Sequence, residues 1–252
     1  MSQVAIITGG TRGIGHATVE RLLRDGYAVG FCGRDARLGY ELQGELAHLG
    51  PAKFVRADVG AERDVEAFIA ACAHELGPPT VLVNNAGRNA NFDATTMTEA
   101  DWDAFFAVDL KSAWLCAKHT LPHMRASGGG AIVNVSSIHA SATLEGFFPY
   151  AAAKAGLAGL TRSLALDHGP DGIRVNCLCP GFTDTRLVRE SMERAEDPAA
   201  AERAMVAGVA LGRIAAPEEI AATIAFLASP EASYITGATL YVDGGLTARR
   251  AG

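Results

Sequence analysis

The first 25 residues constrain the fold most strongly. A short apolar run, Val4–Thr8, leads into the glycine-rich stretch GGTRGIG at 9–15, and a helical pattern follows as far as Asp25. An apolar run without polar alternation is typical of a parallel strand buried on both faces. The order strand, glycine turn and helix predicts a unit in which a phosphate group lies at the helix N-terminus.

The same alternation continues along the chain and predicts an α/β fold. Further strands are predicted at Ala28–Cys32, Lys53–Ala57, Val81–Asn84, Ala131–Val135, Arg174–Cys179 and Thr239–Val242. Helices are predicted at Ala36–Leu49, Glu62–Leu76, from a Thr98 cap to about Ser127, Pro149–His168 and Pro217–Leu227. Strands that alternate with helices of this length form a doubly wound parallel sheet, here of about seven strands, with helices on both faces.

Nothing in the chain indicates a break between domains, so residues 1–252 are predicted to form one Rossmann domain. The segment 183–212 is polar, contains helical runs and has no predicted strand. Long segments between elements often close over ligands, and we interpret this one as a substrate lid.

Charge and composition exclude several classes of function. The net charge is −6 and the Lys and Arg residues are scattered, which argues against a nucleic-acid or anionic membrane surface. No signal peptide is expected, since the first apolar run ends in the glycine turn, and no apolar run is long enough to span a membrane. The five cysteines are dispersed, without zinc spacing, and are expected to be reduced core thiols in a cytoplasmic protein. Cys177 and Cys179 belong to a predicted strand, where side chains alternate faces, and are not expected to form a redox pair.

The glycines of the first turn have the spacing Gly-x-x-x-Gly-x-Gly. Gly9 would permit the tight turn, Gly13 the close approach of a pyrophosphate, and Gly15 close packing of the helix on the strand. The alternative is a glycine turn without a ligand.

The residues after the second strand bear on the choice of nucleotide. An NAD site usually has a carboxylate at this strand end, whereas an arginine accommodates the 2′-phosphate of NADP. Here Gly33 is followed by Arg34, and Asp35 is better interpreted as the cap of the next helix. Arg12 supplies a second cation from the glycine turn. The sequence therefore predicts NADPH rather than NADH, unless Arg34 is only a solvated loop charge.

Three residues form the candidate catalytic group. Tyr150 and Lys154 are four positions apart in a predicted helix, and so they share a face. A cation one turn away favours the phenolate of a tyrosine and makes proton transfer near neutral pH easier. Ser137 ends the preceding strand and would contact the same substrate oxygen. The alternative is a buried tyrosine beside a lysine that reaches solvent.

These groups are predicted to converge, because ligands of such sheets bind at the carboxyl ends of the strands. The segments at those ends are Gly9–Gly15, Arg34, Asp58, Asn85–Gly87, Ser137 and Pro180–Thr185.

The chain resembles the short-chain dehydrogenase/reductase family over nearly its whole length. The motifs are TGGTRGIG (8–15), Asp58-Val59, NNAG (84–87), Ser137, YAAAK (150–154), PGFTDT (180–185) and ITGATLYVDGG (235–245). The resemblance implies that Tyr150 exchanges the proton, that Lys154 holds the nicotinamide ribose, and that Ser137 orients the carbonyl. It also implies cofactor contacts by Gly9, Thr11, Arg12, Gly13, Ile14, Gly15, Arg34, Asp58, Val59, Asn85, Ala86, Gly87, Tyr150, Lys154, Pro180, Gly181, Thr183 and Thr185. Relatives in this family build homotetramers through the segment at 235–245, and the same assembly is expected here.

One position departs from the family. An asparagine that holds a relay water in the family is replaced by Asp109. An ionised carboxylate accepts hydrogen bonds but donates none. We interpret Asp109 as a relay member in altered form, with a structural carboxylate in a helix kink as the alternative.

The resemblance is to 3-oxoacyl-[acyl-carrier-protein] reductases and polyketide ketoreductases. Two carrier-docking arginines of the former correspond to Gly128 and Asp171, which disfavours an acidic carrier, although Arg125 and Arg174 could substitute. The expected activity is NADPH-dependent reduction of an apolar, aromatic or β-keto ketone. Three alternatives remain: a carrier-protein reductase, an NAD-dependent secondary alcohol dehydrogenase and a non-catalytic cofactor-binding regulator. The predicted substrate contacts are Ser137, His139, Leu144, Phe148, Tyr150 and Leu187.

Overall fold

A computed structural model describes residues 3–193 and 197–248. Its centre is a seven-stranded sheet in the order β3-β2-β1-β4-β5-β6-β7, and every neighbouring pair is parallel. The strands are β1 (Val4–Ile7), β2 (Ala28–Gly33), β3 (Ala52–Arg56), β4 (Pro79–Asn84), β5 (Gly130–Val135), β6 (Ile173–Pro180) and β7 (Thr239–Val242). The predicted doubly wound parallel sheet is confirmed.

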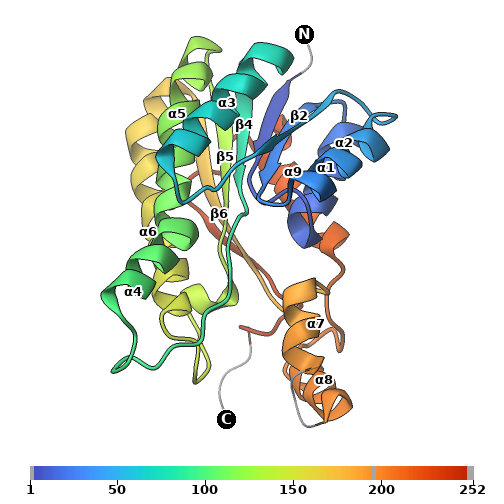
Figure 1. The fold of residues 1–252 in the computed structure, drawn as a ribbon, viewed down its shortest axis with the longest axis vertical. Coiled ribbons are helices and arrows are strands. Elements are labelled where there is room, and N and C mark those ends of the chain that lie inside the picture. The colour runs from blue at the N-terminus through green and yellow to red at the C-terminus, as the bar shows by residue number, and fades with distance from the viewer. Residues whose placement is uncertain (1–2, 194–196, 249–252) are drawn as a thin grey trace.

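Helices cover both faces of the sheet (Figure 1). One face carries α1 (Gly13–Arg24), α2 (Ala36–Leu46) and α9 (Pro217–Ala228) over a core that includes Leu22, Phe31 and Ile224. The other carries α3 (Glu62–Leu76), α5 (Ser112–Ala126) and α6 (Tyr150–His168) over a second core that includes Phe68 and Leu115. The strands are apolar on both sides because each side is buried.

The strand order reverses direction at β1, which pairs with β2 on one side and with β4 on the other. Ligands of doubly wound sheets bind at this switch point, outside the carboxyl ends of the strands. The glycine turn after β1 and the NNAG motif after β4 are therefore neighbours.

The helical region predicted from Thr98 is divided in the structure. Thr98 caps α4 (Glu99–Phe106) by accepting a hydrogen bond from the Asp101 amide at 3.1 Å. A π-helical segment, Ala107–Lys111, then joins α4 to α5. The extra residue in a π turn changes the direction of the side chains that follow, and apolar periodicity in the sequence does not reveal it.

Other element ends differ by a few residues from the prediction. Helix α6 begins at Tyr150, with Pro149 as its cap, and α2 ends at Leu46 rather than Leu49. The predicted cap Asp35 accepts a hydrogen bond from the Leu38 amide at 3.1 Å. Short 3₁₀ turns occupy Ile138–Ala140, Gly169–Asp171 and Pro230–Ala232.

The segment proposed as a lid contains α7 (Arg186–Glu193) and α8 (Pro198–Ala207), which lie beyond the sheet (Figure 1). A parallel bridge pairs Thr183, where the segment begins, with Ala215, three residues beyond its end.

All five cysteines are buried and free, as expected. The argument from alternating faces was wrong for Cys177 and Cys179, because residues two apart in a strand share a face. Their thiols contact each other in one small cluster with Ala158.

Within the described residues, no helix has both the length and the apolarity to cross a bilayer. The same residues contain no group of three or more His, Cys, Asp or Glu side chains suited to hold a metal ion.

Candidate active site

The predicted catalytic residues converge beyond the ends of β5 and β6. Ser137 follows β5, is only 8% exposed, and its hydroxyl accepts a hydrogen bond from the His139 amide at 3.3 Å. Tyr150 is the first residue of α6, and the Lys154 Nζ lies 5.4 Å from the centroid of its ring. The prediction that Tyr150 and Lys154 share a helix face is confirmed.

Ser136 fixes the start of α6 to the sheet. Its hydroxyl donates to the backbone oxygen of Lys154 at 2.8 Å, and its amide donates to the Leu178 oxygen at 2.7 Å. Sequence reasoning assigned no role to this serine. The only signal was its place beside Ser137 at a strand end, and the contact shows that it positions the helix.

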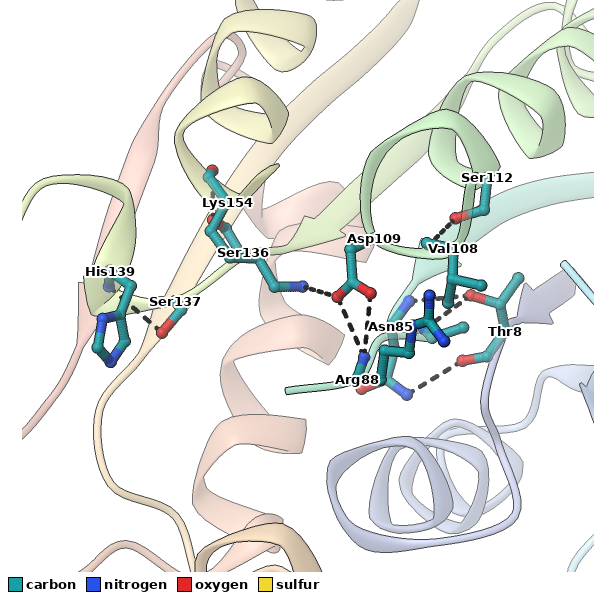
Figure 2. A network of polar contacts seen from close by, with 11 residues as sticks. Thr8, Asn85, Arg88, Val108, Asp109, Ser112, Ser136, Ser137, His139 and Lys154 are labelled. Atoms are coloured by element: carbon teal, nitrogen blue, oxygen red, sulfur yellow. Dashed lines mark hydrogen bonds and ion pairs between the residues drawn. The ribbon is translucent and has the colours of Figure 1, made fainter. Parts of the chain in front are cut away.

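Asp109 points toward Lys154 from the π-helical segment (Figure 2). Its Oδ1 lies 3.6 Å from the Lys154 Nζ, and the two side chains are 0% and 5% exposed. The Arg88 amide donates to both carboxylate oxygens, at 3.1 and 3.3 Å. Burial raises the pKa of the Asp109 carboxyl, and the charge of Lys154 only partly offsets this. Asp109 therefore belongs to the same polar network as the candidate catalytic group.

The glycine loop has the close-packed geometry that the sequence predicts. Gly9 and Gly13 have φ angles of 67° and 53°, in the left-handed region that glycine tolerates. A Cβ on Gly15 would come within 2.1 Å of the Gly9 oxygen. The backbone at the N-terminus of α1 is therefore bare, as a pyrophosphate site requires.

The NNAG motif braces this loop from β4. The Asn85 side-chain amide donates to the backbone oxygens of Thr8 and Gly9 at 3.0 and 3.2 Å (Figure 2). The Thr8 hydroxyl accepts from the amides of Asn85 and Ala86, both at 3.0 Å. The sequence indicates no role for Thr8 beyond its strand, although Thr8 opens the TGGTRGIG motif.

The predicted nucleotide-selecting residues lie beyond β2. Arg34 is exposed. Arg12 forms an ion pair with Asp35 at 3.3 Å. Thr11 packs where a side chain on Gly33 would lie, since a Cβ there would be 2.9 Å from its methyl group. The two arginines thus flank the strand end, but one of them already has an anionic partner.

The remaining cofactor residues line the same edge of the sheet. The Asp58 carboxylate accepts from the Gly60 amide at 2.9 Å, and Val59 is buried. Ile14 packs against the core under α1. Asp58 and Val59 follow β3 and Ile14 lies in α1, and their contacts with a nucleotide stay a prediction.

The turn after β6 reaches the glycine loop from the other side. Pro180 ends β6, and the Gly181 amide donates to the Val242 oxygen at 3.0 Å. Thr183 is buried and donates to the Gly181 oxygen at 3.1 Å. The Thr185 methyl group lies 3.1 Å from the place a Cβ on Gly13 would take, so this turn meets the start of α1.

An aromatic cluster lies beside Tyr150. His139 stacks on Phe147 with ring centroids 4.3 Å apart, and its edge meets the Tyr150 ring at 5.4 Å. Burial lowers the pKa of His139, which favours a neutral imidazole. The Phe147 ring centroid lies 6.3 Å from that of Tyr150, so Phe147 is beside the candidate proton donor.

The other predicted substrate contacts are less closely joined to this cluster. The Phe148 ring packs toward Trp102, 6.0 Å away, and Leu144 is 58% exposed. The Leu187 side chain lies outside the described residues. These three assignments stay predictions.

A cavity of about 460 Å³ opens beside the glycine loop rather than at Tyr150. Residues from α1, α7 and α9 line it, among them Gly13, Thr185 and Arg189. The cavity thus lies between the start of α1 and the segment proposed as a lid.

Comparisons with known proteins agree with this geometry. A family model described as Enoyl-(Acyl carrier protein) reductase matches residues 9–247. The chain is 44% identical over 248 residues to a cis-4-hydroxycyclohexanecarboxylate dehydrogenase from Sinomonas cyclohexanicum, covering 98% of this chain and 97% of the relative.

Two solved structures share the whole fold. The crystal structure of levodione reductase has a TM-score of 0.93 at 30% identity and covers 98% of each chain. A variant of the actinorhodin polyketide ketoreductase with NADPH has a TM-score of 0.93 at 32% identity, covering 97% of each chain. The motifs, the sheet order and these matches together show that the chain belongs to the short-chain dehydrogenase/reductase family and is an oxidoreductase that acts on alcohol or ketone groups.

Proposed function

We propose that this protein is an NADPH-dependent reductase that converts a ring ketone to a secondary alcohol. The observation that carries the proposal is that Lys154 lies beside the Tyr150 ring and against Gly87 of the NNAG motif, whose Asn85 braces the close-packed glycine loop. The stacked rings of His139 and Phe147 supply aromatic packing next to Tyr150. A relative whose named substrate contains a cyclohexane ring supports the choice of a cyclic substrate.

Each residue has a distinct part in this reaction. Ser137 donates a hydrogen bond to the carbonyl oxygen and orients it, and Tyr150 gives that oxygen its proton. Lys154 holds the nicotinamide ribose and keeps a positive charge near the Tyr150 ring. The bound dinucleotide supplies the hydride. In the reverse direction Tyr150 accepts the proton of the alcohol.

The preference for NADPH rests on the end of β2. Gly33 closes the strand without a carboxylate, and Arg34 and Arg12 are the cations nearest in sequence to the predicted 2′-phosphate site. The neighbour solved with NADPH supports this choice. Asp35 favours the second candidate, an NAD-dependent secondary alcohol dehydrogenase, because it places a carboxylate two residues beyond the strand end.

A carrier-bound substrate is disfavoured. The Arg125 guanidinium is paired with Asp171 at 2.7 Å, and Arg174 donates to the Leu227 oxygen at 2.8 Å. Both arginines that could have docked an acidic carrier are therefore engaged within the chain. We further propose a single domain with 183–212 as its lid, assembled as a homotetramer in the cytoplasm.

The test is consumption of NADPH with a panel of cyclic ketones, β-ketoesters and acyl thioesters. Tyr150→Phe should lower the rate by about 10²- to 10⁴-fold, while NADPH binding, followed by fluorescence, is retained. Arg34→Asp should reverse the cofactor preference. Faster turnover with NADH in the wild type would support the second candidate instead. Full activity of Tyr150→Phe would contradict the assigned proton donor, and a regulator without catalysis would show cofactor binding and no turnover.

A further inference from the structure

Asp109 has surroundings suited to an anion. Its carboxylate is 0% exposed, and Lys154 and the Arg88 amide approach it as donors. The Arg88 guanidinium lies near enough to favour the ionised carboxylate, and it stacks over the Phe105 ring at 5.6 Å. An asparagine here would direct its NH₂ group toward either an ammonium or an amide donor. The chain thus places cations and hydrogen-bond donors around Asp109, whose ionised carboxylate only accepts hydrogen bonds.

The absence of a side chain at Gly87 makes the contact possible. A Cβ at this position would lie 3.0 Å from the Asp109 Oδ1 and 3.1 Å from the Lys154 Nζ. Gly87 therefore lies against both ends of the ion pair, and its backbone leads directly to Arg88. The π-helical segment also contributes to this contact, because Asp109 belongs to it.

The titratable groups that face Lys154 come from three elements. Asp109 approaches it from the π-helical segment, and Tyr150 lies one turn before it on α6. From β6, the Cys179 thiol is close enough to feel its positive charge. Among these groups, the Asp109 carboxylate is the one whose ionised form carries a full charge opposite to that of the Lys154 ammonium, and its Oδ1 lies 3.6 Å from the Lys154 Nζ.

We infer that Asp109 is a positioning residue that neutralises Lys154 and thereby raises the pH at which Tyr150 becomes an effective base. An opposite charge close to an ammonium weakens the field that the ammonium exerts on its other neighbours. Lys154 therefore stabilises a Tyr150 phenolate less than it would beside an uncharged residue. This inference rests on the proposed function, since it assigns Tyr150 the proton transfer.

The pair itself is tested without any activity, by thermal unfolding of the cofactor-free protein. Removing one partner of a buried ion pair leaves an uncompensated charge, which is more costly than removing both. Lys154→Met should therefore lower the melting temperature, and Asp109→Asn combined with Lys154→Met should melt higher than Lys154→Met alone. If the fall in melting temperature of the double variant equals the sum of the falls in the two single variants, the two side chains do not form an ion pair, whatever reaction the enzyme catalyses.

The role of the pair is tested by the pH dependence of kcat/KM for alcohol oxidation. With Asp109→Asn, the rise in activity toward alkaline pH should move by about one unit to lower pH, because Lys154 regains its full field. Asp103→Asn on the exposed face of α4 also removes one negative charge and should leave the profile in place. Gly87→Ala keeps both charges but forces them apart, and it should shift the profile in the same direction by less.

An unchanged profile in both Asp109→Asn and Gly87→Ala would overturn the positioning role. If no alcohol or ketone is turned over at all, the proposed function fails, while the unfolding measurements still decide whether the pair exists.

Discussion

The guanidinium of Arg12 and the carboxylate of Asp35 are 3.3 Å apart, so the glycine loop is joined by an ion pair to the N-terminus of α2. Both side chains are nearly half exposed, at 49% and 43%. The pair places a negative charge beside one of the two cations proposed for the 2′-phosphate. Asp35 therefore opposes the preference that Arg12 and Arg34 create.

Asp35→Asn should increase the preference for NADPH. Asparagine caps a helix as well as aspartate, so α2 should keep its start while Arg12 is released. An exposed ion pair is worth less than about 1 kcal/mol, so the ratio of kcat/KM for NADPH to that for NADH should rise about two- to fivefold. Asp25→Asn breaks a comparable exposed pair with Arg21 at 2.8 Å and serves as the control. A fall in the ratio would contradict the assignment of Arg12.

Gly15→Ala should abolish cofactor binding and destabilise the fold. The new Cβ would meet the Gly9 oxygen at 2.1 Å, and such overpacking costs about 1–3 kcal/mol. Gly44→Ala is the matched control. It lies in the interior of α2 with nothing within 4 Å of the new Cβ, so it should stabilise the protein by about 0.5–1 kcal/mol. Urea unfolding and NADPH titration measure both effects.

The protein should lose stability in mild acid through His139. Burial lowers the pKa of His139 in the folded state, whereas the unfolded chain binds the proton near the ordinary value of about 6.5. The stabilisation is therefore present above that pH and is lost as the pH falls. His139→Gln should show a smaller fall in melting temperature between about pH 7.5 and about pH 5.5 than the wild type. His48→Gln, at an exposed position, should behave like the wild type.

Arg174 is expected to act in folding and not in docking a carrier. Its guanidinium donates to the Leu227 and Ser229 oxygens at 2.8 and 3.0 Å, where α9 ends. Arg174→Met should lower the free energy of unfolding by about 2–3 kcal/mol in urea titrations. Arg162→Met, on the exposed face of α6, should have little effect. Equal stability of the two variants would show that these carbonyls do not depend on Arg174.

The sequence predicted the strands, the parallel sheet and the residues that follow the strands' carboxyl ends, because buried parallel strands and glycine turns have strong local patterns. The prediction that Tyr150 and Lys154 lie on one helix face followed from their spacing of four residues alone. The π-helical turn at Ala107–Lys111 was not predicted, since one extra residue in a turn leaves hydrophobic periodicity almost unchanged.

Contacts between distant segments were also beyond local patterns. The pairing of Arg12 with Asp35 spans 23 positions, and the packing of Phe147 on His139 depends on the path of a loop. A sequence can show that such residues lie in the same region. Which of them are in contact depends on the path of the folded backbone.

The hydrogen bonds from the Asn85 side chain reach back 77 and 76 positions along the chain, to Thr8 and Gly9. A nascent chain that ends before β4 would present the glycine loop without this brace. The nucleotide site is thus completed only when the two central strands have paired. A ligand that binds the completed site stabilises the native state over the unfolded one. In a cell, the supply of dinucleotide would consequently influence how much of this protein survives synthesis, as well as how fast it works.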